Sequence, residues 1–251
     1  MNSLKFIFPA KLQSWLQRRR KAVERSLIAF DRVTDWNVLR RTQPYRGELG
    51  GRRGAYIDRY YIEAFLAEHR DAIRGRVAEI ESNEYTLRFG GSAVTESDVI
   101  DLNAQNSART ITLDLQQTDA APEALFDCIL CTQTLFLIRD YMAAIQTLRR
   151  MLKPGGSLLA TVPGISPVIR GSLIAGSGED LWRFTSRSAQ FAFENVFRAS
   201  NVLVRSYGNV LTCTAFLHGL IQEELTAQEL EFHDPDYELI IGVKATKTVD
   251  A

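Results

Sequence analysis

The chain has 251 residues and carries no net formal charge at pH 7, with 45% hydrophobic and 24% charged residues. These proportions are typical of a globular protein that buries its own core, and the length suits one α/β domain with additions. A neutral net charge disfavours a protein that binds nucleic acid over its whole surface. No apolar run approaches the roughly 20 residues of a membrane-spanning helix, and the first residues hold too short an apolar stretch for a secretion signal. We therefore expect a cytoplasmic protein.

The N-terminal 57 residues are expected to be an extension of the main domain. Residues 9–30 place apolar side chains three and four apart, which predicts a helix, and four basic residues interrupt it at 18–21. We interpret it as a helix packed on the domain with a solvated basic face, and a peripheral contact with a membrane surface or a partner is the alternative. A glycine-rich loop over 42–57 follows. This pattern divides the chain into an extension, 1–57, and a domain, 58–251.

The domain alternates predicted strands with helices. A helix is expected to begin with Asp58 as its N-cap and to run through His69. Val, Ile and Leu are frequent in the following strands, as in parallel strands buried on both faces, so the alternation predicts an α/β fold with helices on both faces of the sheet. Pro154 and Gly155 are expected to end the first crossover helix. The predicted strands are 76–80, 97–102, 109–114, 126–131, 156–163, 200–207 and 237–244, and the later helices cover about 139–152, 186–198 and 211–225.

The three cysteines give no disulfide framework. Cys128 and Cys131 form a CxxC pattern, but they lie in a predicted strand, where residues three apart point to opposite faces. We interpret them as reduced core cysteines rather than as a redox pair or metal ligands. Cys213 stands alone. No spacing of His, Cys and carboxylate residues indicates a metal site.

The central block, 126–163, joins a hydrophobic-Asp strand start, a helix, a Lys-Pro-Gly-Gly turn and a second strand. This block resembles the class I S-adenosylmethionine (SAM) methyltransferases, and segments 57–62, 85–91, 182–185 and 207–220 resemble bacterial methyltransferase-domain proteins linked to glycan or surface-polysaccharide biosynthesis. The resemblance implies a Rossmann-like fold with a seven-stranded, mostly parallel sheet in the order 3-2-1-4-5-7-6. It also implies SAM as the cofactor, bound across the carboxyl ends of the first four strands.

The resemblance assigns cofactor contacts along that edge. An acidic Glu79 ends the first strand, but Glu81 stands in a loop that normally carries glycines. Asp101 would bind the ribose hydroxyls or else be a solvated strand-end charge, and Asp114 would lie near the adenine or else cap a turn. Tyr60 would cover the cofactor or pack into the core. The implied contacts are Glu79, Ile80, Glu81, Asp101, Leu102, Asp114, Leu115, Thr132, Gln133 and Tyr60.

The catalytic base is harder to assign. Many relatives carry Glu and His where this chain has Phe136 and Leu137, so a base must come from elsewhere. We expect Asp180 as the base and Arg183 as the residue that positions an anionic or polyhydroxyl substrate, with a structural ion pair in a Trp-anchored loop as the alternative. His218 is a second candidate base, although it lies on an apolar helix where a core or interface histidine is the common case.

The function implied by the resemblance is SAM-dependent O-methylation of a sugar, a glycolipid or a small metabolite. The alternative is a catalytically inactive binding or scaffold module in a glycan-assembly system. A nucleotide-sugar or dinucleotide enzyme is disfavoured because no GxGxxG follows residues 76–80. The expected partner is a small-molecule or glycan substrate and not a nucleic acid, and a homodimer is left open.

Overall fold

The computed structural model describes residues 41–45, 54–103, 105–170 and 179–248. The chain divides into two compact units, residues 1–43 and 44–251, and every helix and strand named below belongs to the second. The predicted helix at 9–30 and half of the glycine-rich loop at 42–57, residues 46–53, lie outside the described residues. None of the described helices is both long enough and apolar enough to cross a membrane.

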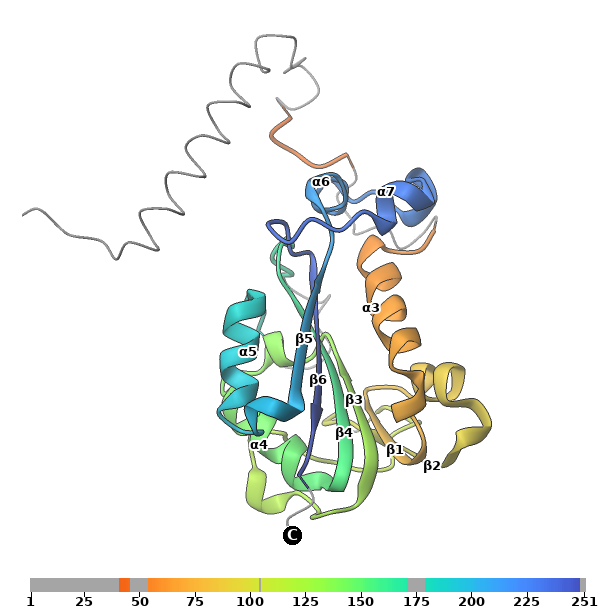
Figure 1. Cartoon of the computed structure of the whole chain (residues 1–251), viewed down its shortest axis with the longest axis vertical. Coiled ribbons are helices and arrows are strands. Elements are labelled where there is room, and N and C mark those ends of the chain that lie inside the picture. Colours follow the sequence, from red (N-terminus) through yellow and green to blue (C-terminus); the bar gives the residue numbers. More distant parts are fainter. Residues whose placement is uncertain (1–40, 46–53, 104, 171–178, 249–251) are drawn as a thin grey trace, which may run out of the picture. The chain divides into compact units, whose positions relative to one another are not determined.

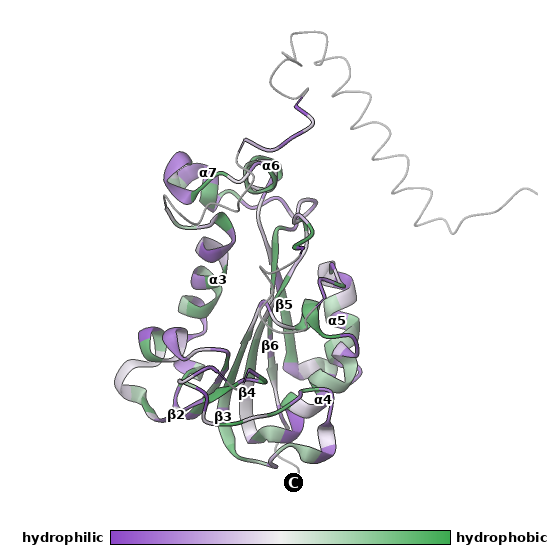
Figure 2. Ribbon diagram, turned by 180° about the vertical axis from the view of Figure 1, so that it is seen from behind, coloured by the Kyte–Doolittle hydropathy of each residue, from purple (hydrophilic) through white to green (hydrophobic). Residues whose placement is uncertain are grey.

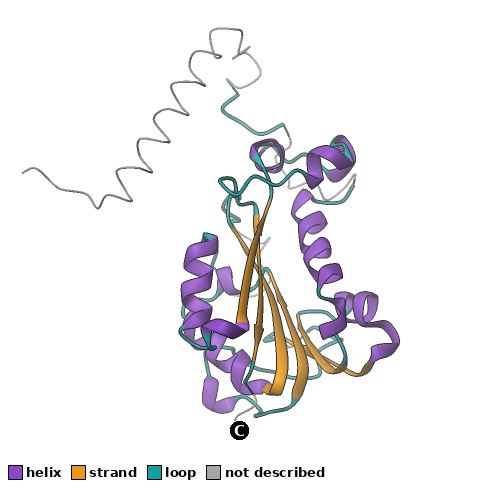
Figure 3. Ribbon diagram, in the orientation of Figure 1, coloured by secondary structure: helices purple, strands orange, loops and turns teal. Residues whose placement is uncertain are grey.

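The described part of the second unit contains a six-stranded sheet in the order β2-β1-β3-β4-β6-β5 (Figure 3). Its first four members are parallel, and β6 runs antiparallel to both of its neighbours. This is the order implied by the resemblance with its outermost strand removed, so the predicted Rossmann-like α/β fold is confirmed. The strands are β1 (Gly75–Ile80), β2 (Val94–Ile100), β3 (Phe126–Thr132), β4 (Leu152–Pro163), β5 (Val202–Tyr207) and β6 (Ile240–Thr246).

The prediction of a strand at 109–114 is wrong. This segment makes a single isolated bridge, between Ile111 and Ile100 of β2. The backbone N–H groups of Thr110 and Ile111 both donate to the carbonyl of Val99, and the Thr110 hydroxyl accepts the Val99 N–H at 3.0 Å. The Thr110 side chain therefore accepts a hydrogen bond that a backbone carbonyl of a regular edge strand would accept. The pairing with β2 stops after one residue.

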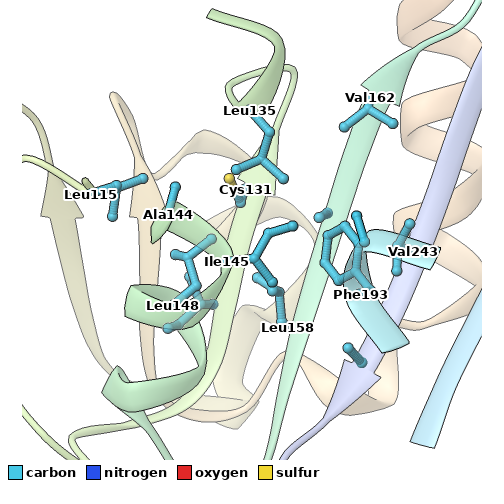
Figure 4. Close-up of a cluster of buried hydrophobic side chains, with 14 of the residues drawn as sticks. Leu115, Cys131, Leu135, Ala144, Ile145, Leu148, Leu158, Val162, Phe193 and Val243 are labelled. Carbon is cyan, nitrogen blue, oxygen red and sulfur yellow. The ribbon is translucent and has the colours of Figure 1, made fainter. Parts of the chain in front are cut away.

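Helices cover both faces of the sheet (Figure 1). Helix α3 lies against one face, and α4 and α5 lie against the other. The strands β3, β4 and β6 are hydrophobic along most of their length, as Figure 2 shows, because both of their faces are buried. Figure 4 shows the core beneath α4 and α5, where Ile145 and Leu148 meet Leu158 and Phe193. The helices are α3 (Ile57–Glu68), α4 (Tyr141–Met151), α5 (Ser186–Glu194), α6 (Val210–Leu217) and α7 (Ala227–Glu231).

Several helix ends differ from the prediction. The later helices are shorter than predicted, since α5 ends at Glu194 instead of 198 and α6 ends at Leu217 instead of 225. The N-cap position of α3 belongs to Tyr56, so Asp58 is not the cap but lies in the first turn of the helix. Helix α4 begins at an Asp140 cap, which accepts the N–H of Ala143, and ends at Met151. Strand β4 follows at once, so the Lys-Pro-Gly-Gly segment lies within the strand instead of forming a separate turn. The bend that it needs comes from Gly155, whose φ of 81° is readily adopted by glycine.

The cysteines occupy the positions that the alternation of strand side chains predicts. Cys128 belongs to the core beneath α3, and Cys131 belongs to the core beneath α4 and α5. Both are buried free thiols, as is Cys213. Burial raises the pKa of Cys128 and of Cys131 to about 12. The two thiols of the CxxC pattern therefore face away from each other, and the interpretation as core cysteines is confirmed.

Candidate functional site

The parallel strands end at one edge of the sheet. The first turn of α3 and the helix α6 lie near this edge (Figure 1). Loops leave this edge after each of the four parallel strands β1, β2, β3 and β4, and the first three carry the implied cofactor residues. In open α/β sheets, ligands bind in the crevice outside such carboxyl ends. The residues implied as cofactor contacts lie in or beside these loops, apart from Tyr60 on α3.

Glu79 fixes the path of the chain after β1. It is 2% exposed, and its carboxylate accepts the backbone N–H groups of Thr86 at 2.7 Å and Tyr85 at 3.4 Å and the hydroxyl of Ser82 at 3.2 Å. Burial raises the pKa of Glu79, and these hydrogen bonds oppose the rise in part. The Glu79 side chain thus stabilises the loop after β1, because the N–H groups of Tyr85 and Thr86 would otherwise lack a partner.

Glu81 keeps a glycine-like backbone without being glycine. Its φ is 72°, in the left-handed region that non-glycine residues adopt at a cost. Its N–H donates to the carbonyl of Ile100 at 2.9 Å, and its carbonyl accepts the side-chain amide of Asn106 at 2.7 Å. The Glu81 side chain is exposed at this edge. The turn therefore follows a path that glycine normally supplies, with a carboxylate added.

Asp101 and Asn106 join the loops after β1 and β2. One carboxylate oxygen of Asp101 accepts the Asn103 N–H at 2.8 Å, and the other accepts the Asn106 amide at 2.7 Å. The same amide nitrogen reaches the Glu81 carbonyl, so Asn106 links the two loops. Sequence analysis missed Asn106, and the only signal for it is the run of Asp and Asn residues that favours side-chain turns. The neighbouring Leu102 is 61% exposed.

The other implied cofactor residues take varied positions. Asp114 accepts the backbone N–H of Gln116 at 2.9 Å, which is the turn-capping arrangement, and Leu115 is buried in the core beneath α4. Ile80 packs partly buried against the same core. Tyr60 packs against the core beneath α3, with its ring 5.3 Å from that of Tyr61.

The segment after β1 is contacted from α3 by Arg59 and by Glu63, which pairs with Arg88, and Tyr60 makes no such hydrogen bond among the described residues. A guanidinium nitrogen of Arg59 donates to the Tyr85 hydroxyl at 3.4 Å. Burial raises the pKa of Tyr60, and the nearby charge of Glu231 on α7 adds to the rise. The Tyr60 ring thus lies toward α7. Arg59 is a residue that sequence analysis did not single out, because no spacing pattern distinguishes it from other surface arginines.

Gln133 follows β3 and has a left-handed backbone, with a φ of 49°. Its N–H donates to the carbonyl of Thr161 on β4 at 2.9 Å, and its side-chain amide lies 3.4 Å from the Thr161 hydroxyl. Thr132, the last residue of β3, accepts the hydroxyl of Thr134 at its carbonyl. Glu81 and Gln133 are thus both non-glycine residues with positive φ, placed at the carboxyl ends of the adjacent strands β1 and β3.

A cleft lies at the carboxyl ends of β3 and β4. Its wall combines four polar side chains, Asp58, Gln133, Ser166 and Arg183, with apolar groups that include Phe136 and Phe216. Pro163 ends β4 and pairs with Ile240 of β6, and both also line it. The cleft is therefore built from the start of α3, the loop after β3 and the segment that precedes α5.

Asp180 and Arg183 form an ion pair in which both carboxylate oxygens are bonded to the guanidinium. The Asp180 side chain is 1% exposed, and both of its oxygens accept hydrogen bonds from Arg183 while one also accepts the Ile169 N–H at 2.6 Å. Burial raises the pKa of Asp180, but these hydrogen bonds outweigh burial and the pKa is lowered. The arrangement is that of the structural ion pair in a Trp-anchored loop, since Trp182 donates from its indole N–H to the Ile138 carbonyl at 2.9 Å.

Arg183 has no donor left for a substrate in this arrangement. Its five N–H groups meet both oxygens of Asp180 and the backbone carbonyls of Trp182, Pro167 and Ser166, the last at 3.5 Å. The guanidinium also lies 5.6 Å from the Phe136 ring centre. Arg183 therefore positions the loop around the cleft.

Asp58 presents the contrasting carboxylate. It lies partly buried in the first turn of α3, and its Oδ1 accepts the N–H of Arg59 at 2.8 Å. No ion pair to Asp58 occurs within the described part of the chain. Burial raises its pKa above the ordinary value of 3.8, and this effect outweighs the lowering by the charge of Arg59 and by the backbone N–H groups. Sequence analysis assigned Asp58 to a helix cap, because an acidic residue before an apolar helix usually has that role.

His218 ends α6 beside the cleft and does not line it. Its Nδ1 is buried without a hydrogen-bond partner in the described part of the chain, and its ring lies 5.0 Å from that of Tyr45. The neighbouring Phe216 is the α6 residue that contributes to the cleft wall. The site thus brings together Asp58, Gln133 and Arg183 and leaves His218 outside.

The sheet order and the carboxyl-edge loops define the Rossmann-like methyltransferase fold. The profile of the methyltransferase domain family matches residues 48–200, and the chain belongs to this family. SAM, the cofactor implied by the sequence, is the methyl donor of such enzymes. No curated protein sequence matches the chain.

Two solved structures resemble the chain in fold. A SAM-dependent methyltransferase from Mesorhizobium loti is 16% identical, with a TM-score of 0.50 over 80% of this chain and 100% of that chain. The [4+2]-cyclase SpnF is 17% identical, with a TM-score of 0.50 over 83% of this chain and 88% of that chain. At such identities the likeness concerns the fold alone, and the site must be argued from its own residues.

Proposed function

We propose that this protein is a SAM-dependent methyltransferase that methylates a hydroxyl group of a sugar, a glycolipid or another small metabolite. The observation that carries the proposal is the pair of left-handed, non-glycine residues, Glu81 and Gln133, at the carboxyl ends of adjacent strands. Such strained backbone persists only where the surroundings impose it, and it gathers at functional sites. A third such residue, Ala124, precedes β3 in the chain and belongs to a turn.

The side chains along the edge fit the cofactor. Asp101 has acceptor capacity beyond its two hydrogen bonds, which suits a ribose diol, and Asp114 and Gln133 add a carboxylate and an amide nearby. Glu81, Asp101 and Gln133 would hold SAM, and the bound cofactor would supply a methyl group on a positively charged sulfonium. The exposed Glu81 carboxylate has the sign that suits this cation.

The protein's own part in the reaction is alignment and exclusion of water. The cleft wall formed by Phe136, Phe216 and Ile240 is apolar, which favours the exclusion of water from an acceptor held there. Leu181 and Trp182 hold the segment before α5 against the loop after β3 through hydrogen bonds to the carbonyls of Phe136 and Ile138. The ion pair of Arg183 with Asp180 braces that segment, and together these contacts fix one side of the cleft. We further infer a cytoplasmic protein, in keeping with its free, buried cysteines.

Calorimetric titration with SAM and S-adenosylhomocysteine tests the proposal. We expect binding of both and a rise in the melting temperature in their presence. Absence of heat together with an unchanged melting temperature would contradict it.

The second candidate is an inactive module of the same fold that binds a partner in a glycan-assembly system. It is supported by the glycine-free loop at Glu81 and by the apolar Phe136 and Leu137 after β3. In that case neither ligand would bind, and the chain would co-purify with other proteins of the assembly.

A further inference from the structure

We propose that Asp58 is the residue that accepts the proton of the methyl acceptor, an inference that rests on the proposed function. Asp58 lines the cleft together with Gln133, at the carboxyl ends of β3 and β4. Of the two carboxylates near this cleft, Asp180 is enclosed by Arg183 and by the Ile169 N–H, whereas Asp58 forms no ion pair with any described residue. Asp58 is thus the carboxylate with an oxygen left to meet a ligand.

The proton balance of the reaction requires such a group. When a hydroxyl oxygen gains a methyl group, the carbon–sulfur bond breaks with its electron pair on the sulfur, and the new ether oxygen must release one proton. Asp58 takes that proton on a carboxylate oxygen and later returns it to solvent. A carboxylate in a partly apolar cleft is a stronger base than one in water, because burial disfavours its charged form.

The charges around the cleft also select the acceptor. The charged and titratable groups around Asp58 are Arg59 on its own helix, Tyr85 on the loop after β1 and Arg183 across the cleft. Arg59 donates to the neutral hydroxyl of Tyr85 and does not line the cleft, and Arg183 is neutralised by Asp180. Among the described residues that line the cleft, Asp58 is therefore the charged group without an ion-pair partner. The acceptor class that fits is a neutral hydroxyl compound with an apolar portion, and not a phosphate or a carboxylate.

Sinefungin tests the position of Asp58 without knowledge of the acceptor. This cofactor analogue carries a protonated amine where SAM carries its transferable methyl group, so a carboxylate facing that position binds the amine. We expect the wild-type protein to bind sinefungin more tightly than S-adenosylhomocysteine. In Asp58→Asn, sinefungin affinity should fall at least about tenfold while affinity for S-adenosylhomocysteine stays within about twofold.

Asp71→Asn is the matched control, because Asp71 is an exposed aspartate beyond the other end of α3, in the turn Arg70–Ala72. Its ligand affinities should equal those of the wild type. The pH dependence of the wild type supplies a second measurement that needs no variant. The preference for sinefungin should disappear as the pH falls through the pKa of Asp58, while S-adenosylhomocysteine binding continues.

Three results are decisive. Loss of the sinefungin preference in Asp58→Asn alone supports the inference. Binding of S-adenosylhomocysteine with an unchanged sinefungin preference in Asp58→Asn would overturn the role of Asp58 and leave the proposed function standing. Failure of the wild type to bind S-adenosylhomocysteine would overturn the proposed function, and the inference with it.

Discussion

The start of α3 and the segment before α5 each place one aspartate, Asp58 and Asp180, in or beside the cleft. The pKa values of these two carboxyl groups are shifted in opposite directions. Asp180 lies almost fully buried, yet its pKa is lowered because Arg183 and a backbone N–H hold the charged form. The pKa of Asp58 is raised because burial outweighs the charge of Arg59 and the backbone N–H groups. The balance between burial and hydrogen-bond partners thus decides which carboxylate is stabilised as an anion.

The comparison separates a structural role from a chemical one. A carboxylate with both oxygens occupied by a guanidinium stabilises the loop that it belongs to, and it offers little basicity. A carboxylate that the fold leaves without a cation is unfavourable for stability and available for chemistry. The following experiments test this contrast, from the largest expected effect to the smallest.

Removing the charge of Asp180 should have the largest effect on stability. In Asp180→Asn, Arg183 is left partly buried without its counterion, and we expect the free energy of unfolding to fall by about 2–4 kcal/mol. Urea unfolding measures this loss. Glu179→Gln is the control, because its ion pair with Arg139 is exposed and should be worth less than about 1 kcal/mol. Strongly reduced turnover without a loss of stability would instead favour Asp180 as the base.

Substitution of Glu79 should rank next. In Glu79→Gln, the amide oxygen can still accept the N–H of Thr86, but the amide nitrogen then faces the N–H of Tyr85, a donor against a donor, and the cost should be about 1–3 kcal/mol. Denaturant unfolding and S-adenosylhomocysteine titration measure the effect on the fold and on the loop. Glu84→Gln changes an exposed residue of the same loop and should leave both quantities unaltered. An equal effect of the two substitutions would contradict the role assigned to Glu79.

The two aspartates should give opposite pH dependences of stability. The folded-state pKa of Asp58 lies above its ordinary 3.8, so its contribution to stability is present below pH 3.8 and is lost as the pH rises through the raised value. The folded-state pKa of Asp180 lies below 3.8, so its contribution is present above that value and is lost as the pH falls. Melting temperatures of the wild type and of Asp58→Asn, followed from acid to neutral pH, measure the difference. The variant should be the more stable protein at neutral pH, and a lower melting temperature there would count against the raised pKa.

Glu81→Gly should have the smallest effect on stability. Relief of the left-handed strain, offset by the entropy of glycine in the unfolded chain, should change stability by no more than about 1 kcal/mol. Affinity for S-adenosylhomocysteine should change as well, because the carboxylate is lost at the same time. Ala124→Gly is the matched control, since Ala124 has a φ of 50° in a turn before β3. It should show the effect on stability alone, and a shift in its ligand affinity would argue against a special role for the Glu81 turn.

Much of the fold could be predicted from the sequence. Buried strands such as β3 and β4 are recognisable as apolar runs, and the resemblance of the central block supplied the sheet order. The segment at 109–114 was mistaken for a strand because its alternation of residues fits an extended edge equally well. What ends the ladder there is a hydrogen bond from the Val99 backbone to the Thr110 side chain, and a one-dimensional pattern does not encode it.

The candidate site was less predictable, for two physical reasons. Asp58 is a common helix-start residue in sequence, and its place in the cleft depends on how α3 packs against the sheet. Arg183 is suited to an anionic ligand in isolation, but the backbone carbonyls of Ser166 and Pro167, near the start of the same segment between β4 and α5, occupy its donors. The place of Asp58 and the partners of Arg183 both depend on tertiary structure. The places of Glu79 and Gln133 could be predicted, because each residue stands at the end of a predicted strand.

The placement of Cys128 and Cys131 on opposite faces of one strand offers a built-in reporter of local opening. With thiol pKa values near 12, neither is a thiolate at neutral pH, so an alkylating reagent reacts only after the surrounding core has opened. If Cys128 and Cys131 were labelled at unequal rates, the core layer under α3 and the core layer under α4 and α5 would open independently of each other. Equal rates would mean that the sheet and its two layers open as one cooperative unit.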